Sequence, residues 1–191
     1  MLAVMKMGVI KKTIKRLVYR IRGEYTVQQL EELGLHVGEN FSCLHGTVLD
    51  PAHCWLIDIG DNVTLAPDVH ILCHDASTKS RLGYTKIGRV NIGDRVFIGA
   101  HTVILPGVSI GDDVIVGANS TVTKDIPEGM VYAGCPAKPI CTTNQYLEKE
   151  RNRMKETVVY DEEWTLRKNV SMEKRMKQKN DLRDKKIGYV D

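Results

Sequence analysis

One imidazole, that of His74, is the leading candidate for a general base. It stands near the start of a stretch, 73–86, that separates two regularly patterned segments. Histidine is the side chain best suited to accept a proton near neutral pH. A long loop inserted into a regular fold commonly carries function. The residues alone leave one alternative, a histidine exposed on a loop without a role.

Three other polar side chains are candidates for binding an acceptor near His74. Asp50 and His53 belong to the segment 49–55, and Asp75 directly follows His74. A carboxylate can accept hydrogen bonds from sugar hydroxyls, and Trp55 in the same segment can stack on a sugar face. The alternatives are a structural aspartate at a corner and a tryptophan packed on the wall of the fold.

The histidines also permit a metal-binding interpretation. His70 and His74 have H-x3-H spacing. In the solenoid that the repeat described below predicts, His53 lies about one coil before them. Imidazoles from neighbouring coils or subunits bind zinc in β-helical carbonic anhydrases. This spacing on a strand does not specify a zinc site, so we expect no metal.

A six-residue repeat predicts the fold that positions these residues. The pentapeptide motif IGD-x-V recurs at 59–63, 92–96 and 110–114. Aliphatic residues recur every six positions, at Ile92, Ile98, Ile104, Ile110, Val116 and Val122. Neither an α-helix nor an alternating strand has this period. A parallel β-helix does, with the aliphatic residue facing inward and glycine and aspartate at the corners.

The repeat is interrupted after Ile71. The next three inward positions would be Ser77, Gly83 and Arg89, and none of them is aliphatic. A solenoid accommodates such an insertion only as a loop projecting from one corner. We therefore expect the loop that follows His74 to project from the wall.

The two ends of the chain differ from the repeat. Residues 1–34 are predicted to form a helical cap, made of a basic amphipathic helix over 4–22 and a short helix over 27–33. Binding of 4–22 to a membrane surface or an acidic partner is the alternative to capping. Residues 35–140 form the predicted β-helix, and 141–191 a charged, partly helical extension.

Composition narrows the class of protein. The 191 residues carry a net charge of +3 and five cysteines, an odd number without a CxxC pair. This argues against a disulfide framework or a zinc ribbon and predicts a cytoplasmic protein, with peripheral contact at the inner face of the membrane as an option. We expect no nucleic-acid partner, because the basic run lacks interleaved aromatic residues.

Residues 35–140 resemble the hexapeptide-repeat acyltransferases, especially the maltose and galactoside O-acetyltransferases. The segments that carry the resemblance are 96–112, 116–127 and 133–138. The resemblance implies a left-handed β-helix, a homotrimer with active sites between subunits, acetyl-CoA as co-substrate and His74 as catalytic base. Proline often follows the family's histidine, whereas Asp75 follows here, so we expect the acceptor pocket to differ in shape.

The resemblance also implies cofactor-binding positions. Small residues that let pantetheine approach the backbone, and residues near the nucleotide and phosphates, correspond to Gly99, Ala100, Gly117, Ala118, Thr123, Lys124 and Lys138. Lysine binds phosphate as a point charge.

The predicted function is transfer of an acetyl group from acetyl-CoA to a saccharide hydroxyl, such as that of a cell-surface polysaccharide precursor. Acetylation of an antibiotic or an amino acid is the alternative within the enzymes. A metal-dependent hydratase of the carbonic anhydrase type and a non-catalytic scaffold are the alternatives from other classes.

Overall fold

The computed structural model describes residues 25–191. The basic helix predicted over 4–22 therefore lies outside the described residues. The chain divides into two compact units, one ending at Thr143 and one formed by Asn144–Asp191.

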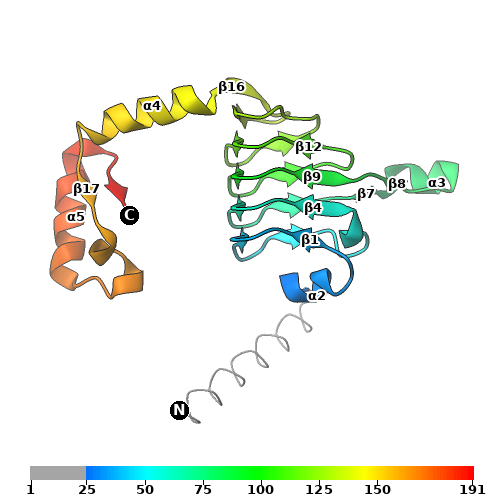
Figure 1. Cartoon of the computed structure of the whole chain (residues 1–191), viewed down its shortest axis with the longest axis horizontal. Coiled ribbons are helices and arrows are strands. Elements are labelled where there is room, and N and C mark those ends of the chain that lie inside the picture. Colours follow the sequence, from blue (N-terminus) through cyan, green and yellow to red (C-terminus); the bar gives the residue numbers. More distant parts are fainter. Residues whose placement is uncertain (1–24) are drawn as a thin grey trace, which may run out of the picture. The chain divides into compact units, whose positions relative to one another are not determined.

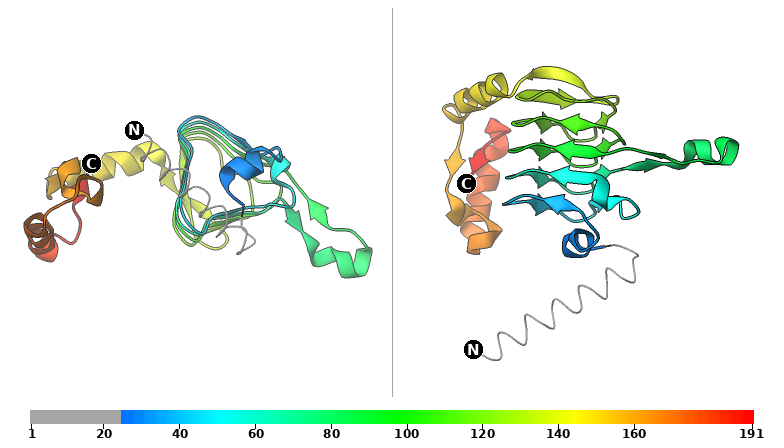
Figure 2. Two further views of the ribbon diagram at one scale, coloured as in Figure 1. Left: turned by 90° about the horizontal axis from the view of Figure 1, so that it is seen from below. Right: turned by 45° about the vertical axis from the view of Figure 1, so that its right-hand side comes forward.

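The first unit is a parallel β-helix with three sheets, wound as a triangular coil (Figures 1 and 2). The first sheet contains β1 (His36–Val37), β4 (Ile57–Ile59), β9 (Val90–Ile92) and β12 (Ser109–Ile110). The second contains β2 (Ser42–Cys43), β5 (Thr64–Leu65), β10 (Phe97–Ile98), β13 (Ile115–Val116), β15 (Met130–Ala133) and β16 (Lys138–Thr142), of which β16 runs antiparallel to β15. The third contains β3 (Val48–Leu49), β6 (His70–Ile71), β11 (Val103–Ile104) and β14 (Thr121–Val122).

The repeat predicts the core correctly. All six aliphatic residues of the repeat are buried, with at most 3% of the residue exposed. They stack in register from coil to coil, as in the pairs Ile98↔Val116 and Ile104↔Val122. Each buried aliphatic side chain contributes about 1.5–3 kcal/mol, so this column supplies much of the stability.

Aspartates of the IGD motif form hydrogen bonds between successive coils at the corner between the first and second sheets. The Asp94 carboxylate accepts a hydrogen bond from Asp61 N–H at 2.8 Å. The Asp112 carboxylate accepts one from Asp94 N–H at 3.0 Å. These aspartates therefore have the structural role that the repeat predicts.

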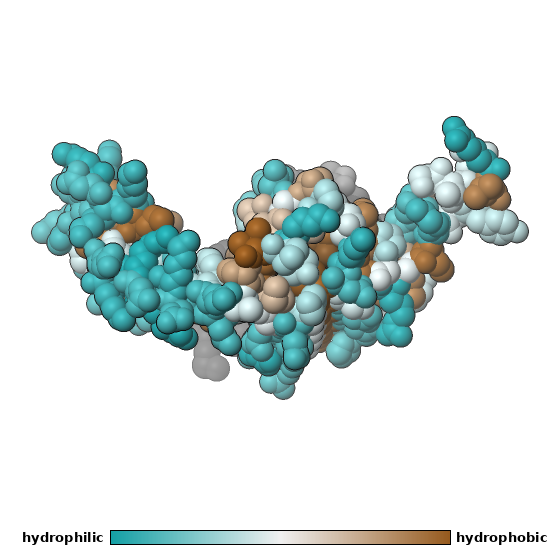
Figure 3. Space-filling model, turned by 90° about the horizontal axis from the view of Figure 1, so that it is seen from above, coloured by the Kyte–Doolittle hydropathy of each residue, from teal (hydrophilic) through white to brown (hydrophobic). Residues whose placement is uncertain are grey.

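The interruption after Ile71 is a projecting arm, as expected (Figures 1 and 2). It contains β7 (His74–Asp75), η2 (Ala76–Thr78), α3 (Lys79–Leu82) and β8 (Lys86–Ile87), and β7 and β8 pair antiparallel at its base. Gly83 ends α3 with a φ of 79°, a left-handed conformation that glycine adopts easily. Figure 3 shows hydrophobic side chains on this arm, among which Leu82 and Ile87 are exposed.

A short helix, α2 (Val27–Glu31), precedes the first coil. Its N-terminus is capped by Thr26, which forms a reciprocal capping box with Gln29. Leu30 is buried in the solenoid core. The helix thus covers part of the first coil with one apolar side chain.

The second unit begins with most of α4 (Thr143–Met154). It continues through β17 (Val159–Tyr160), η3 (Glu162–Trp164), η4 (Leu166–Lys168), α5 (Met172–Lys185) and β18 (Tyr189–Val190). Strands β17 and β18 pair in parallel, and the Tyr160 and Trp164 rings lie 4.6 Å apart. No helix in residues 25–191 has the length and apolarity needed to cross a membrane.

Candidate active site

His74 and Asp50 form a hydrogen-bonded pair at the base of the arm. Asp50 follows β3, and His74 begins β7 just after the end of β6, the strand that pairs with β3. Nδ1 of His74 lies 2.6 Å from Oδ2 of Asp50. The carboxylate side chain is fully buried, whereas the imidazole is 38% exposed. The Nδ1 edge of the ring is thus held by Asp50, while the ring remains accessible.

The Asp50 carboxylate is held in its ionised form. Its burial acts to raise its pKa, but the Cys73 N–H, the His74 ring and the Ala52 N–H together lower the pKa below its usual value. The Cys73 N–H donates to Oδ2 at 2.7 Å, and the Ala52 N–H donates to Oδ1 at 3.2 Å. An ionised Asp50 accepts a hydrogen bond from Nδ1–H of His74, which leaves Nε2 of the ring free to accept a proton.

This arrangement does not support the acceptor contact that the sequence suggested for Asp50. Only 1% of the residue is exposed, and both carboxylate oxygens already accept hydrogen bonds from the chain. Asp50 acts instead on His74, as a residue that orients the ring.

His53 lies beside the pair. Its ring centroid is 5.4 Å from that of His74 and 5.3 Å from that of Trp55. Its Nδ1 is buried and has no hydrogen-bond partner in residues 25–191. Buried polar atoms are rarely left without a partner, so His53 calls for an explanation beyond packing.

Asp75 makes its contacts within the arm rather than with the His74–Asp50 pair. Its Oδ2 lies 2.6 Å from Nζ of Lys86, and Oδ1 accepts a hydrogen bond from Ser77 N–H at 2.8 Å. The hydrogen bond from Lys86, followed by those from Ser77, holds the pKa of Asp75 well below its usual range. Asp75 therefore closes the β7–β8 hairpin, and the acceptor contact suggested for it gains no support.

The proposed cofactor residues are divided between two corners of the coil. Gly99 and Ala100 follow β10, and Gly117 and Ala118 follow β13 in the coil stacked on it. They form the corner between the second and third sheets. Thr123 and Lys124 follow β14 at the next corner, which is also where the chain leaves β6 for His74.

Lys138 lies at the corner of the four small residues, one coil further along, because its partner Ala133 stacks on Gly117. It is the first residue of β16 and pairs with Ala133 at the last coil. The single chain thus brings together four small residues at one corner and places His74 at another.

The backbone N–H of Ala100 makes no hydrogen bond within the described part of the chain, so it is able to donate to a ligand. The residue at the equivalent place one coil earlier is Pro67, which has no N–H.

Asp50, His53 and His74 also bear on the metal-binding alternative. One donor atom from each lies within 4.8 Å of the others. Two histidines and a carboxylate can hold zinc with one open position. The 2.6 Å hydrogen bond between Asp50 and His74 leaves no space for an ion between those two atoms, so a metal would have to replace that bond. His70, the other histidine of the H-x3-H spacing, does not belong to this group.

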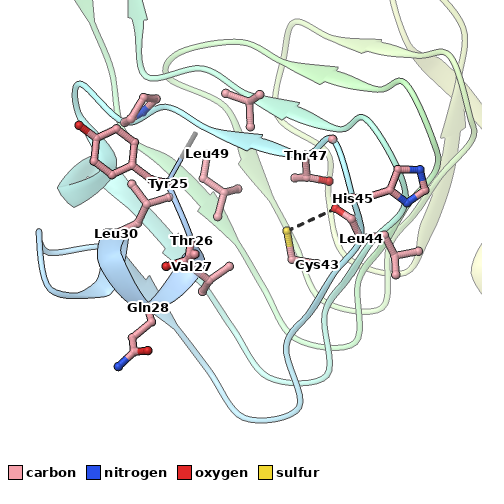
Figure 4. A pocket seen from close by; sticks show the side chains of 13 residues that line it. Tyr25, Thr26, Val27, Gln28, Leu30, Cys43, Leu44, His45, Thr47 and Leu49 are labelled. Carbon is pink, nitrogen blue, oxygen red and sulfur yellow. Dashed lines mark hydrogen bonds between the residues drawn. The ribbon is translucent and has the colours of Figure 1, made fainter. Parts of the chain in front are cut away.

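A separate hollow of about 580 Å³ lies at the first coil (Figure 4). Tyr25, Val27 and Leu30 line it from the cap, and Leu44 and Val48 are among the residues that line it from the coil. The hollow includes none of the proposed site residues. It lies at the end of the solenoid where the described chain begins.

The repeat family model described as bacterial transferase hexapeptide (six repeats) matches residues 89–124. Protein CapG of Staphylococcus aureus is 39% identical over 145 residues, which cover 73% of this chain and 82% of that protein. This chain belongs to the hexapeptide-repeat acyltransferases, in the branch of the maltose and galactoside O-acetyltransferases.

Two further relatives define that branch. Galactoside O-acetyltransferase of Escherichia coli (strain K12) is 39% identical over 117 residues, covering 58% of this chain and 55% of that protein. A maltose O-acetyltransferase structure from Clostridium difficile 630 is 44% identical, with a TM-score of 0.51, covering 57% of this chain and 59% of that one. The chain spans about half the length of several curated relatives that it matches. Membership of this family implies a left-handed β-helix, as the resemblance suggested.

Proposed function

We propose that this hexapeptide-repeat protein transfers the acetyl group of acetyl-CoA to a hydroxyl of a saccharide, with His74 as the general base. The observation that carries the proposal is the 2.6 Å bond between the accessible His74 ring and the buried, ionised Asp50. The names of the relatives, galactoside and maltose O-acetyltransferases, support the reaction and the acceptor class.

The proposed reaction is a direct transfer. Nε2 of His74 takes the proton of the acceptor hydroxyl as its oxygen attacks the acetyl carbonyl carbon. The tetrahedral intermediate collapses by breaking the carbon–sulfur bond, and His74 returns the proton to the thiolate of coenzyme A. A positioned base contributes about 10²–10⁴-fold to such a reaction. Asp50 stabilises the imidazolium that forms between the two proton transfers.

The division of the site residues between two corners supports a site shared by subunits. We place acetyl-CoA against the small residues at Gly99, Ala100, Gly117 and Ala118, and the unpaired N–H of Ala100 is the proposed donor to the oxyanion. Thr123, Lys124 and Lys138 are the proposed contacts to the nucleotide and phosphates. Because His74 lies at another corner of its own chain, a homotrimer would bring His74 of one subunit to the small-residue corner of the next.

The proposal is tested by release of coenzyme A from acetyl-CoA, followed with a thiol reagent. The acceptors are maltose, methyl β-galactoside and serine, and the proteins are the wild type and His74→Ala. We expect release with a saccharide and its loss in the variant. Release with serine alone would instead establish the amino-acid alternative. A monomeric mass by light scattering would contradict the shared site.

A metal-dependent hydratase is the second candidate function, since Asp50, His53 and His74 cluster within 4.8 Å. Metal analysis of the purified protein and a CO₂ hydration assay discriminate it. Stoichiometric zinc with hydration activity and no use of acetyl-CoA would favour the hydratase over the transferase.

A further inference from the structure

Three aromatic rings form a row that begins at the proposed base. The centroids of His74 and His53 lie 5.4 Å apart at an interplanar angle of 42°, and those of His53 and Trp55 lie 5.3 Å apart at 50°. Exposure is 38% for the His74 side chain and 55% for the Trp55 residue at the end of the row. The row therefore leads from the ring of the proposed base to an exposed indole.

Contacts with the N-terminal cap fix the backbone at the Trp55 end of this row. Cys54, between His53 and Trp55 in the chain, is fully buried, and its Sγ lies 3.6 Å from the Leu30 carbonyl oxygen. A Cβ added at Gly34 would lie 3.0 Å from Cβ of Trp55, so the backbone at the end of the cap touches the base of the tryptophan. Cys54 and Trp55 belong to a single 3-10 turn, η1 (Cys54–Leu56). An exposed tryptophan is thus positioned by contacts at its base.

His53 supplies a hydrogen-bonding group within the row. Its Nδ1 is buried without a partner in residues 25–191, and an unpaired N–H there would cost about 1–3 kcal/mol. The proton of a neutral His53 is therefore assigned to Nε2, which is left as the nitrogen able to donate to a ligand. A flat apolar surface next to a polar donor is the combination that suits a sugar ring, with its apolar face and hydroxyl edge.

We infer that Trp55 and His53 form the acceptor subsite, in which the indole stacks on the sugar ring that carries the reacting hydroxyl or on its neighbour. The inference rests on the proposed transferase function and narrows its acceptor to a saccharide held by stacking. It replaces Asp50 and Asp75 as acceptor contacts with residues that are accessible or lack a partner.

Kinetics and fluorescence test the inference together. Trp55 and Trp164 are the two tryptophans of the chain, and Trp164 lies in the second compact unit. In a Trp164→Phe background, maltose and methyl β-galactoside should change the emission of Trp55 in a saturable way. Trp55→Ala should raise KM for the active saccharide about tenfold, equivalent to about 1.4 kcal/mol, and leave KM for acetyl-CoA unchanged. Trp55→Phe should retain most of the affinity, because the ring is kept.

The outcomes separate this inference from the proposed function. Transfer to a saccharide with an unchanged KM in Trp55→Ala would overturn the stacking subsite and leave the transferase intact. Hydrolysis or transfer with serine alone would overturn the saccharide class and the subsite together. Trp164→Phe serves as the matched tryptophan control, and a similar rise of KM in that variant would also contradict a specific role for Trp55. His53→Gln should raise KM for the saccharide, and no change would remove His53 from the subsite.

Discussion

A Cβ atom added to Gly99 would lie 2.4 Å from the backbone nitrogen of Ala118 in the next coil. Real Cβ atoms do not approach backbone this closely, so the coils themselves require glycine at this corner. Gly99 therefore has a structural role even if pantetheine also passes it. A substitution at Gly99 therefore cannot test coenzyme A binding alone, because it also disturbs the fold.

Gly99→Ala should lower the stability of the solenoid. The added methyl group forces the two coils apart, which we expect to cost about 1–3 kcal/mol. Urea unfolding followed by circular dichroism measures the loss. Ala100→Gly, one residue away, is the control, and stability equal to wild type in Gly99→Ala would show that the corner can relax.

His74→Gln should reduce the rate of acetyl transfer by about 10²–10⁴-fold, because the amide cannot take a proton from the hydroxyl. The affinity for coenzyme A, measured by calorimetry, should stay close to that of wild type. Retention of more than about a tenth of the wild-type rate would remove His74 as the base.

Asp50→Asn should impair both the ring orientation and the fold. Oδ2 accepts from Cys73 N–H and from His74, and Oδ1 accepts from Ala52 N–H. Either orientation of the amide places its NH₂ group against a donor, and such a mismatch costs about 1–3 kcal/mol. We expect kcat to fall more than KM for acetyl-CoA rises. A variant with wild-type kcat and altered stability would make Asp50 purely structural.

The pH dependence of unfolding should reveal the same carboxylate. The pKa of Asp50 is lower in the folded chain than the value of about 3.9 for the unfolded chain. Its contribution to stability is therefore complete only above about pH 5, and it is lost progressively as the pH falls through the unfolded and then the folded pKa. The stability difference between wild type and Asp50→Asn should shrink as the pH falls from 6 toward 3. A difference that stays constant over this range would contradict the assignment.

Burial of the repeat column should dominate the stability of the first unit. Ile98 and Ile104 are fully buried, and replacement of either by alanine should cost about 2–5 kcal/mol. Phe97→Ala is the control on the same strand, since Phe97 is 45% exposed and should change stability much less. Equal losses in Ile98→Ala and Phe97→Ala, which lie together on β10, would mean that the exposed side of β10 is also buried in solution.

The solenoid could be predicted from the sequence because its repeat is local. Each six-residue unit contains the residue that faces inward and the residues that form the corner. Ile98 and Ile104 can therefore be assigned to the core without knowledge of distant contacts. The projecting arm was predictable for the same reason, as the place where inward positions fail.

The sequence placed Asp50 near His74, but it did not predict the hydrogen bond between the two side chains. The two residues are 24 apart in the chain, and the segment 49–55 that carries Asp50 departs from the repeat. Only the pairing of β3 with β6 brings the ends of those strands together. The exposure of Trp55 and the unpaired nitrogen of His53 likewise depend on how η1 meets the cap, which no spacing records.

The arm leaves the solenoid and returns to it without disturbing the stacking. Ile59 still pairs with Ile92 although 33 positions separate them. The cost of closing a loop rises slowly with its length, by about 0.6 kcal/mol for each doubling. The part of the arm beyond β7 can therefore be lengthened or changed by design while the coils stay as they are. Gly83, exposed at the end of α3 with open space around it, is the natural point to graft a foreign peptide or a fluorescent label onto this scaffold.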